Sequence, residues 1–113
     1  MIIAVGTDVV SLQRIASAME KPEFIDRILS ANEQQRTITV EYLAGRWASK
    51  EAIKKCLPYL NKWHQVEVIN NVGSAPEVTI HHPEFDPEHH KIHLSISHER
   101  DIAIAFAVLE KFS

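Results

Sequence analysis

Two acidic residues stand out because of the residues around them. Asp8 lies in the apolar, β-branched segment 2–10, where a carboxylate is costly to desolvate unless a cation or a hydrogen-bond donor meets it. Glu51 lies in a basic segment, and Lys55 follows it by one helical turn. Proteins commonly hold Mg²⁺ with one or two carboxylates and leave coordination positions for water and phosphate oxygens. Asp8 and Glu51 are therefore candidate magnesium ligands.

The basic side chains near Glu51 are candidate phosphate ligands: Arg46, Lys50, Lys54 and Lys55. With the two carboxylates they suit phosphoryl transfer, in which positioning and charge neutralisation provide most of the catalysis. Simpler interpretations stay open at this point. Asp8 also suits a helix cap or a pair with Arg14. Glu51 also suits an exposed helical ion pair with Lys55.

Histidine is concentrated in one part of the chain, because six of the seven histidines fall between residues 81 and 98. A zinc site would need converging ligands, but no HExxH motif is present, and the prolines and acidic residues of segment 81–90 are typical of a polar surface loop. In residues 93–98, alternation predicts that Leu94 and Ile96 face one way and the histidines and serines the other. A serine and a histidine in one strand are not a catalytic triad without an orienting acid.

The candidate residues need elements that bring distant parts of the chain together. β-branched residues predict a strand over residues 2–10, and Gly6 allows it to bend or to be approached closely. Ser11 is a candidate cap for a helix that Pro22 ends. A second short helix is predicted over residues 24–29 from its apolar spacing.

The strongest helical pattern lies in the middle of the chain. An apolar stripe predicts a helix from Thr39 to Leu57, closed by Pro58. Just before it, Ser30 and Glu33 form a capping-box signature that predicts a third short helix.

The second half of the chain is predicted to be mainly strand, over residues 65–70, 77–81, 91–98 and 102–109, with turns at 70–74 and 98–101. The last strand has large apolar side chains on one face and alanines on the other, and the alanine face or its neighbours is the expected subunit contact. The order of elements predicts an α+β fold, with an antiparallel sheet packed against one long helix and short helices.

Length and charge narrow the function classes. The 113 residues form one predicted domain, 1–113, and 12 basic against 15 acidic residues give a net charge of −3, which argues against nucleic-acid binding through bulk positive charge. The charge is unevenly spread, with five basic and one acidic residue in segment 44–63. The single cysteine, Cys56, excludes an intramolecular disulfide, and the apolar N-terminus is too short to span a membrane. A cytoplasmic protein with no membrane partner is expected.

Motifs along nearly the whole chain point to one family. They are Val5-Gly6-Thr7-Asp8, Leu12 to Arg14, Phe24 with Arg27-Ile28-Leu29-Ser30 and Glu33, Leu43-Ala44-Gly45-Arg46-Trp47-Ala48-Ser49-Lys50-Glu51-Ala52 with Lys55, Gly73 with Pro76, and His93-Leu94-Ser95-Ile96-Ser97-His98. Each motif is weak alone, but their joint occurrence in this order is specific. The chain resembles the holo-acyl-carrier-protein synthases, the small bacterial class of 4′-phosphopantetheinyl transferases.

The resemblance implies a phosphopantetheinyl transferase-like fold. It also implies transfer of the 4′-phosphopantetheine arm of coenzyme A to a serine of apo-acyl carrier protein, releasing adenosine 3′,5′-bisphosphate, in support of fatty acid biosynthesis. The family's magnesium ligands match Asp8 and Glu51, and its carrier-docking residue matches Arg14. The residues that match its coenzyme A contacts are Arg46, Lys55, Gly73, Pro76 and His98. Family members are typically homotrimers with active sites between subunits, so a homotrimer is expected.

The implied reaction assigns roles to three side chains. The carrier serine attacks the pantetheine-side phosphorus of the coenzyme A pyrophosphate, Asp8 and Glu51 hold the magnesium, and Lys55 stabilises the leaving group. Either Glu51 or a water on the magnesium accepts the serine proton, and the residues favour neither.

Two departures from the family pattern keep other function classes in view. The loop at Gly73–Pro76 lacks the basic residue often found before that proline, and the histidine-rich stretch 81–90 has no counterpart in the family motif. One alternative is a non-catalytic module that binds a nucleotide or an acidic helix, which would not require Asp8 with Glu51. Another is a histidine-rich metal-binding protein, which would be indifferent to coenzyme A.

Overall fold

The computed structural model describes residues 1–71 and 73–113; Val72, inside the predicted turn at 70–74, lies outside the described residues. The elements are β1 (Ile2–Ser11), α1 (Leu12–Ala18), α2 (Pro22–Ile28), α3 (Val40–Cys56), the short 3-10 helix η1 (Trp63–Gln65), β2 (Val66–Ile69), β3 (Glu77–Ile80), β4 (His90–Glu99) and β5 (Ile102–Lys111). The α+β class and the antiparallel pairing are confirmed. The strands form two sheets rather than one, in the orders β1-β5-β4 and β2-β3.

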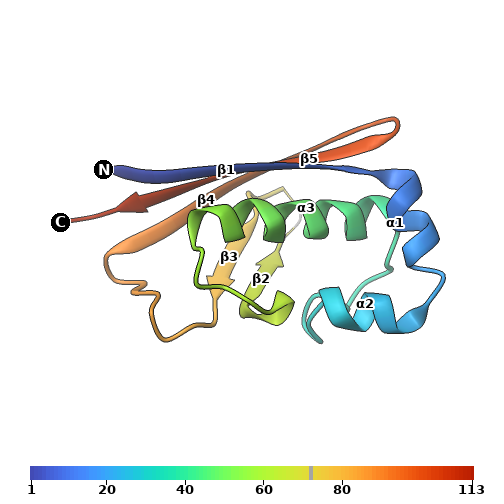
Figure 1. Ribbon diagram of the computed structural model, residues 1–113, viewed down its shortest axis with the longest axis horizontal. Coiled ribbons are helices and arrows are strands. Elements are labelled where there is room, and N and C mark those ends of the chain that lie inside the picture. The colour runs from blue at the N-terminus through green and yellow to red at the C-terminus, as the bar shows by residue number, and fades with distance from the viewer. Residues whose placement is uncertain (72) are drawn as a thin grey trace.

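The long helix α3 is the centre of the molecule. Figure 1 shows α3 running along the three-stranded sheet, and it packs against β1 and β5 and also contacts α1, α2 and β2. Its start is fixed by Thr39, whose hydroxyl accepts a hydrogen bond of 3.1 Å from the Tyr42 backbone N–H. Because α3 is covered on several sides, even polar residues such as Ser49 and Lys50 are buried.

β1 and α3 pack very closely at Gly6. A Cβ atom built on Gly6 would lie 2.1 Å from the Ala52 carbonyl oxygen and 3.1 Å from the Lys55 Cβ. Any side chain at this position would force strand and helix apart, so the predicted close approach is confirmed. The contact brings the C-terminal turns of α3 beside Asp8, which lies two residues after Gly6 on β1.

The two faces of β5 are used in the opposite sense from the one expected. Ala103, Ala105 and Ala107 are fully buried within the chain, on the face that packs against α3, so they are not a subunit contact. Small side chains let the helix approach the sheet closely. The large residues Ile104 and Phe106 point outward and are 39% and 46% exposed.

Two local predictions near the short helices were wrong. The capping box at Ser30 and Glu33 forms both of its hydrogen bonds, but only turns and bends follow it, and the Glu33 side chain is buried. Helix α1 already ends at Ala18, and Pro22 is the first residue of α2, where its missing N–H is harmless. Among the described helices, none has the length and apolar character needed to cross a membrane.

Candidate active site

Asp8 and Lys55 meet where β1 crosses the C-terminal part of α3. The Lys55 Nζ lies 3.9 Å from the Asp8 Oδ1 and donates a hydrogen bond of 2.5 Å to the Thr7 carbonyl oxygen. Burial raises the pKa of the Asp8 carboxyl; the Lys55 ammonium opposes this shift, and the Glu51 carboxylate adds to it. The predicted residues Asp8, Glu51 and Lys55 therefore form one electrostatic group, which we call the carboxylate cluster.

The simpler roles considered for these carboxylates do not describe the structure. The cap of α1 is Ser11, whose hydroxyl accepts a hydrogen bond of 3.3 Å from the Arg14 backbone N–H, and not Asp8. The ion pair of Lys55 is with Asp8 rather than with Glu51. Arg14 influences Asp8 only weakly, as the last of the charges that shift its pKa.

The carboxylate cluster has the donor chemistry of a site for a hard divalent cation. The Asp8 side chain is 19% exposed, and none of the described residues donates a hydrogen bond to its carboxylate. The Lys55 ammonium at 3.9 Å is too distant to do so. A cation bound by Asp8 and Glu51 would offset the repulsion between them, and Mg²⁺ prefers carboxylate oxygens. The residues present fit a magnesium ion.

An aromatic shelf lies next to this cluster, formed by Phe24, Trp47 and Trp63. The Trp47 ring centre is 5.7 Å from that of Phe24 and 4.5 Å from that of Trp63. The Arg14 guanidinium lies over the Trp47 ring at 5.4 Å. Because Trp47 precedes Glu51 by one helical turn, Arg14 and the shelf flank the carboxylate cluster.

A basic groove of about 540 Å³ extends from the shelf between α1 and α2. It is lined by Arg14, Ser17, Ala18, Lys21, Glu23, Phe24 and Arg27. Three cationic side chains against one carboxylate give this groove a net positive charge. Sequence analysis identified Arg14, but not Lys21 and Arg27 as groove residues; their shared charge was the available signal.

A second group of predicted residues lies around the N-terminal half of α3. Arg46, Gly73, Pro76 and His98 all line one open groove of about 710 Å³. Arg46 donates a hydrogen bond of 2.5 Å to the Asn70 side chain, and its Nε is buried without a partner among the described residues. Burial lowers the pKa of the Arg46 guanidinium. The buried Nε is out of reach of a ligand, but the Arg46 guanidinium lines the groove and brings positive charge to it.

Arg36 is a groove residue that sequence analysis missed. Its guanidinium lies 4.1 Å from the centre of the Tyr42 ring, and that of Arg46 lies 4.4 Å from the same centre. Both arginines line the groove together with Glu41, so its lining residues carry two positive charges and one negative charge. The sequence around Arg36 has no helical or strand periodicity, so its positive charge was the available signal.

The predicted orientation of His98 was wrong. His98 belongs with Leu94 and Ile96 on the face toward α3, because residues two apart in a strand share a face, whereas Ser95 and Ser97 point outward. The His98 Nε2 makes a hydrogen bond of 2.9 Å with the Glu41 carbonyl oxygen. This inward orientation is what places the imidazole in the groove.

The predicted site residues thus form two groups within one chain. Asp8, Glu51 and Lys55 line no part of the groove that contains Arg46 and His98. Arg46 and Lys55 are nine positions apart on α3, which corresponds to roughly 13 Å along the helix axis. The carboxylate cluster and the groove around Arg46 are therefore separate within one chain.

The histidines of residues 81–98 do not converge on one point. His81 contacts Glu67 at 2.6 Å, His89 contacts Asp86 at 2.7 Å, and His93 contacts Glu110 at 2.8 Å. In the described part of the chain, the one cluster of three close metal-ligating side chains is Asp86, Glu88 and His89, of which the last two are exposed. The histidine-rich alternative therefore has one histidine in a candidate cluster.

Comparisons with known proteins agree with the motifs. The model of the 4′-phosphopantetheinyl transferase superfamily matches residues 4–107. A holo-[acyl-carrier-protein] synthase of Halalkalibacterium halodurans is 39% identical over an alignment covering 100% of this chain and 99% of the relative. One from Chlorobaculum parvum is 35% identical, covering 94% of this chain and 97% of the relative.

Solved structures give the same result. The synthase from Bacillus anthracis in complex with CoA (3′,5′-ADP) aligns with a TM-score of 0.83 and 31% identity, covering 98% of both chains. The synthase from Helicobacter pylori in complex with coenzyme A aligns with a TM-score of 0.80 and 27% identity, covering 95% of this chain and 100% of the other. The chain belongs to the 4′-phosphopantetheinyl transferase superfamily, in the holo-[acyl-carrier-protein] synthase family.

Proposed function

We propose that this protein transfers the 4′-phosphopantetheine arm of coenzyme A to a serine of apo-acyl carrier protein and releases adenosine 3′,5′-bisphosphate, in support of fatty acid biosynthesis. The observation that carries the proposal is the carboxylate cluster of Asp8, Glu51 and Lys55, found on a chain related over its full length to synthases of this activity. We expect the reaction to take place in the cytoplasm.

Coenzyme A would bind in the groove around Arg46. The molecule carries a pyrophosphate and a 3′-phosphate, and the two arginines of the groove, Arg36 and Arg46, supply charge for such groups. His98 adds a ring nitrogen, and Gly73, at φ 78°, adopts a conformation that brings backbone rather than side chain to the groove beside Pro76. The Gly73–Pro76 loop lacks the basic residue that the family often has before the proline. Arg36 lines the same groove and would supply a positive charge there.

A magnesium ion held by Asp8 and Glu51 would neutralise charge on the phosphate oxygens of coenzyme A. Lys55, fixed by its bond to the Thr7 carbonyl, would place its ammonium where the leaving phosphate gains charge. Glu51 is one candidate to accept the proton of the attacking serine hydroxyl. The half-buried setting of Asp8 strengthens these interactions, since it limits screening by water.

The acyl carrier protein would dock on the basic groove beside the aromatic shelf. Acidic carriers match the charges of Arg14, Lys21 and Arg27, which border the carboxylate cluster through Arg14. This places the carrier serine on the side of α3 where Glu51 lies.

The active assembly would be a homotrimer. The outward face of the three-stranded sheet carries exposed apolar residues: Ile3, Val5, Val9, Ile104 and Phe106. Their contact with another subunit would remove this surface from water. It would also supply the second half of each site, since the carboxylate cluster and the groove around Arg46 stand apart within one chain. Phe106→Glu should yield monomers by light scattering, and trimers of this variant would contradict the assignment.

Intact-mass spectrometry tests the activity directly. Apo-carrier incubated with the protein, coenzyme A and magnesium should gain the mass of one phosphopantetheine group, and Asp8→Asn should abolish the gain. Unchanged carrier mass for several bacterial carriers at neutral pH would contradict the proposed function. Chelation of the metal, followed by addition of Mg²⁺, tests the metal requirement in the same assay.

A further inference from the structure

Lys50, the residue before Glu51, points into the protein. Its Nζ is 2.6 Å from the Glu33 Oε1, 2.7 Å from the Ile28 carbonyl oxygen and 3.3 Å from the Trp63 carbonyl oxygen. The Lys50 and Glu33 side chains are 2% and 0% exposed. An ammonium group has three N–H donors, and all three are used here. Lys50 is therefore not free to bind phosphate, which corrects its assignment from the sequence.

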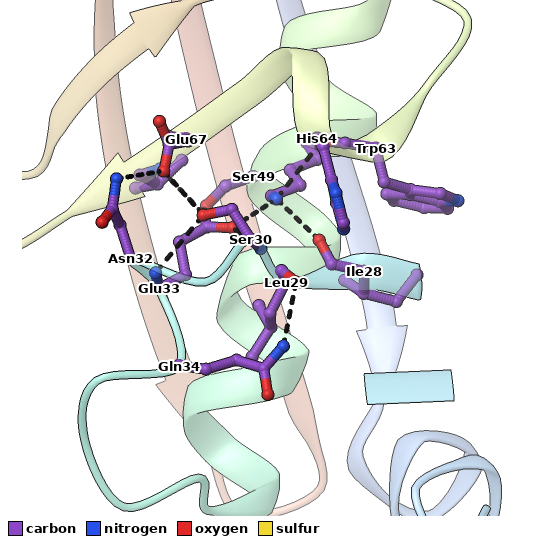
Figure 2. Close-up of polar contacts among 12 residues, drawn as sticks. Ile28, Leu29, Ser30, Asn32, Glu33, Gln34, Ser49, Trp63, His64 and Glu67 are labelled. Carbon is purple, nitrogen blue, oxygen red and sulfur yellow. Dashed lines mark hydrogen bonds and ion pairs between the residues drawn. The ribbon is translucent and has the colours of Figure 1, made fainter. Parts of the chain in front are cut away.

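Glu33 is satisfied as completely as Lys50. Its Oε1 also accepts from the Ser30 backbone N–H at 2.9 Å, and its Oε2 accepts from the Val68 backbone N–H at 2.8 Å. Figure 2 shows Glu33 and Ser30 beside Glu67 of β2, with Ile28 and Trp63 on the other side. We call this pair, with its backbone partners, the Lys50–Glu33 clamp. It joins the end of α2, the following turn, α3, η1 and β2.

The clamp reaches the proposed active site through Trp63. Lys50 holds the Trp63 carbonyl, while the Trp63 ring packs 4.5 Å from the Trp47 ring of the aromatic shelf. Lys50, Glu51 and Trp63 also line one cavity of about 90 Å³ between α3 and the segment that leads to β2. The clamp therefore fixes both walls of the space beside Glu51.

We propose that Lys50 and Glu33 are positioning residues of the transfer reaction: they hold Glu51 and the aromatic shelf in working geometry without touching the reacting atoms. The inference rests on the proposed function. A buried ion pair is weak evidence of added stability, because an apolar pair of similar volume often stabilises equally well. The three hydrogen bonds of the Lys50 ammonium do fix the relative placement of the elements that the clamp joins. A misplacement of about 1 Å at a catalytic group costs on the order of 100-fold in rate.

The test compares variants of the clamp with a neighbour on the same helix. Lys50→Met removes the clamp, Glu33→Gln/Lys50→Met removes both charges together, and Lys50→Arg retains the charge. Ser49→Ala is the matched control, because Ser49 is buried on α3 and, among the described residues, its hydroxyl donates to the Gly45 carbonyl alone, at 2.6 Å. Each variant is measured for unfolding temperature, kcat and the KM for coenzyme A. The chain has two tryptophans, Trp47 and Trp63, so tryptophan fluorescence and near-ultraviolet circular dichroism of the metal-free protein report on the shelf itself.

We expect the double variant to fold and to lower kcat about 10- to 100-fold with the KM for coenzyme A within threefold, together with a changed tryptophan signal. Lys50→Met, if it folds, should show the same lower kcat and the same changed tryptophan signal. Lys50→Arg should have a kcat and a tryptophan signal closer to those of the unaltered protein. Ser49→Ala should keep kcat within about twofold. The inference is overturned if the folded double variant retains normal kcat or an unchanged tryptophan signal, or if Ser49→Ala loses as much kcat at equal stability. Failure of the proposed function can be told apart from failure of this inference. In the first case the unaltered protein would modify no carrier, while the tryptophan signal would still report on the clamp.

Discussion

Helix α3 carries two lysine–carboxylate pairs five residues apart, and they differ in almost every physical respect. Lys50 and Glu33 lie 2.6 Å apart, fully buried, with every donor of the lysine used. Lys55 and Asp8 lie 3.9 Å apart, with side chains 55% and 19% exposed, and the Asp8 carboxylate lacks a hydrogen-bond donor among the described residues. The first pair is complete within the chain. The second is incomplete, as we expect of the proposed binding site for a cation and a phosphate.

Neutralising Asp8 should have the largest effect of any change to these pairs. Asp8→Asn should lower kcat by about a thousandfold, equivalent to ~4 kcal/mol of transition-state stabilisation, because one cation ligand is lost. Stability should not fall. The raised pKa of Asp8 means that its ionised form is disfavoured by folding, so its contribution to stability declines as pH rises through that pKa.

Steady-state kinetics and thermal unfolding, each with and without Mg²⁺, check this prediction. Magnesium should raise the unfolding temperature of the unaltered protein but not of Asp8→Asn. Equal stabilisation of both proteins would show that the cation binds elsewhere, and Asp101→Asn is a control for the general loss of one carboxylate.

Breaking the buried pair should have the next largest effect, on stability. Lys50→Met leaves the Glu33 charge without a partner and should destabilise the fold by about 3 kcal/mol, whereas Lys55→Met removes an exposed ammonium and should cost less than about 1 kcal/mol. Urea denaturation of both variants measures the difference. Similar costs for the two would mean that the pairs are not distinct in the way their geometry indicates.

Removing Arg14 should have a moderate effect that depends on salt. Arg14→Ala should raise the KM for the carrier about tenfold at low ionic strength, equivalent to ~1.4 kcal/mol, with the difference shrinking as salt is added. The KM for coenzyme A should stay nearly constant, since Arg14 lies outside the groove around Arg46. Lys111→Ala, at the far end of β5, provides the charge control; an equal change there would assign the effect to net charge alone.

The smallest expected effect is on the free energy of unfolding at acidic pH. The Ser30 hydroxyl, followed by His81 and Asn32, holds the pKa of Glu67 below its usual value of 4.5. A lowered pKa stabilises the fold above the usual value and loses that contribution as pH falls through the folded value. Glu67→Gln should therefore show a shallower stability loss below about pH 4.5 than the unaltered protein. Glu77→Gln, on exposed β3, should leave the slope as it was; an unchanged slope in Glu67→Gln would contradict the prediction.

The residues that the sequence could locate are those with a strong local pattern. Gly6 in an apolar strand, Asp8 after it and the helix containing Glu51 and Lys55 were all readable, because alternation and helical spacing fix local geometry. The family motifs added their order along the chain. Arg36, Lys21 and Arg27 stand in or beside short helices and turns, where no period relates them to a distant partner.

Two of the errors share one physical cause, which is that tertiary contacts override local signals. The capping box of Ser30 and Glu33 formed its bonds, yet Lys50 and Val68, distant in sequence, decided what the carboxylate does. Similarly, the alanines of β5 were expected at a subunit contact, but the approach of α3 requires small side chains beneath it. Neither α3 nor β2 is visible from the local sequence of those segments.

If the proposed homotrimer forms through the outward large residues of β5, the stability of the fold depends on protein concentration. A single chain in dilute solution exposes Val5, Val9, Ile104 and Phe106 on one sheet face. In the proposed homotrimer, a second copy of the chain covering that face would add binding free energy to the folded state but not to the unfolded one. The midpoint of unfolding should then rise with protein concentration. The free energy of unfolding would be smallest at the lowest concentration at which the protein works.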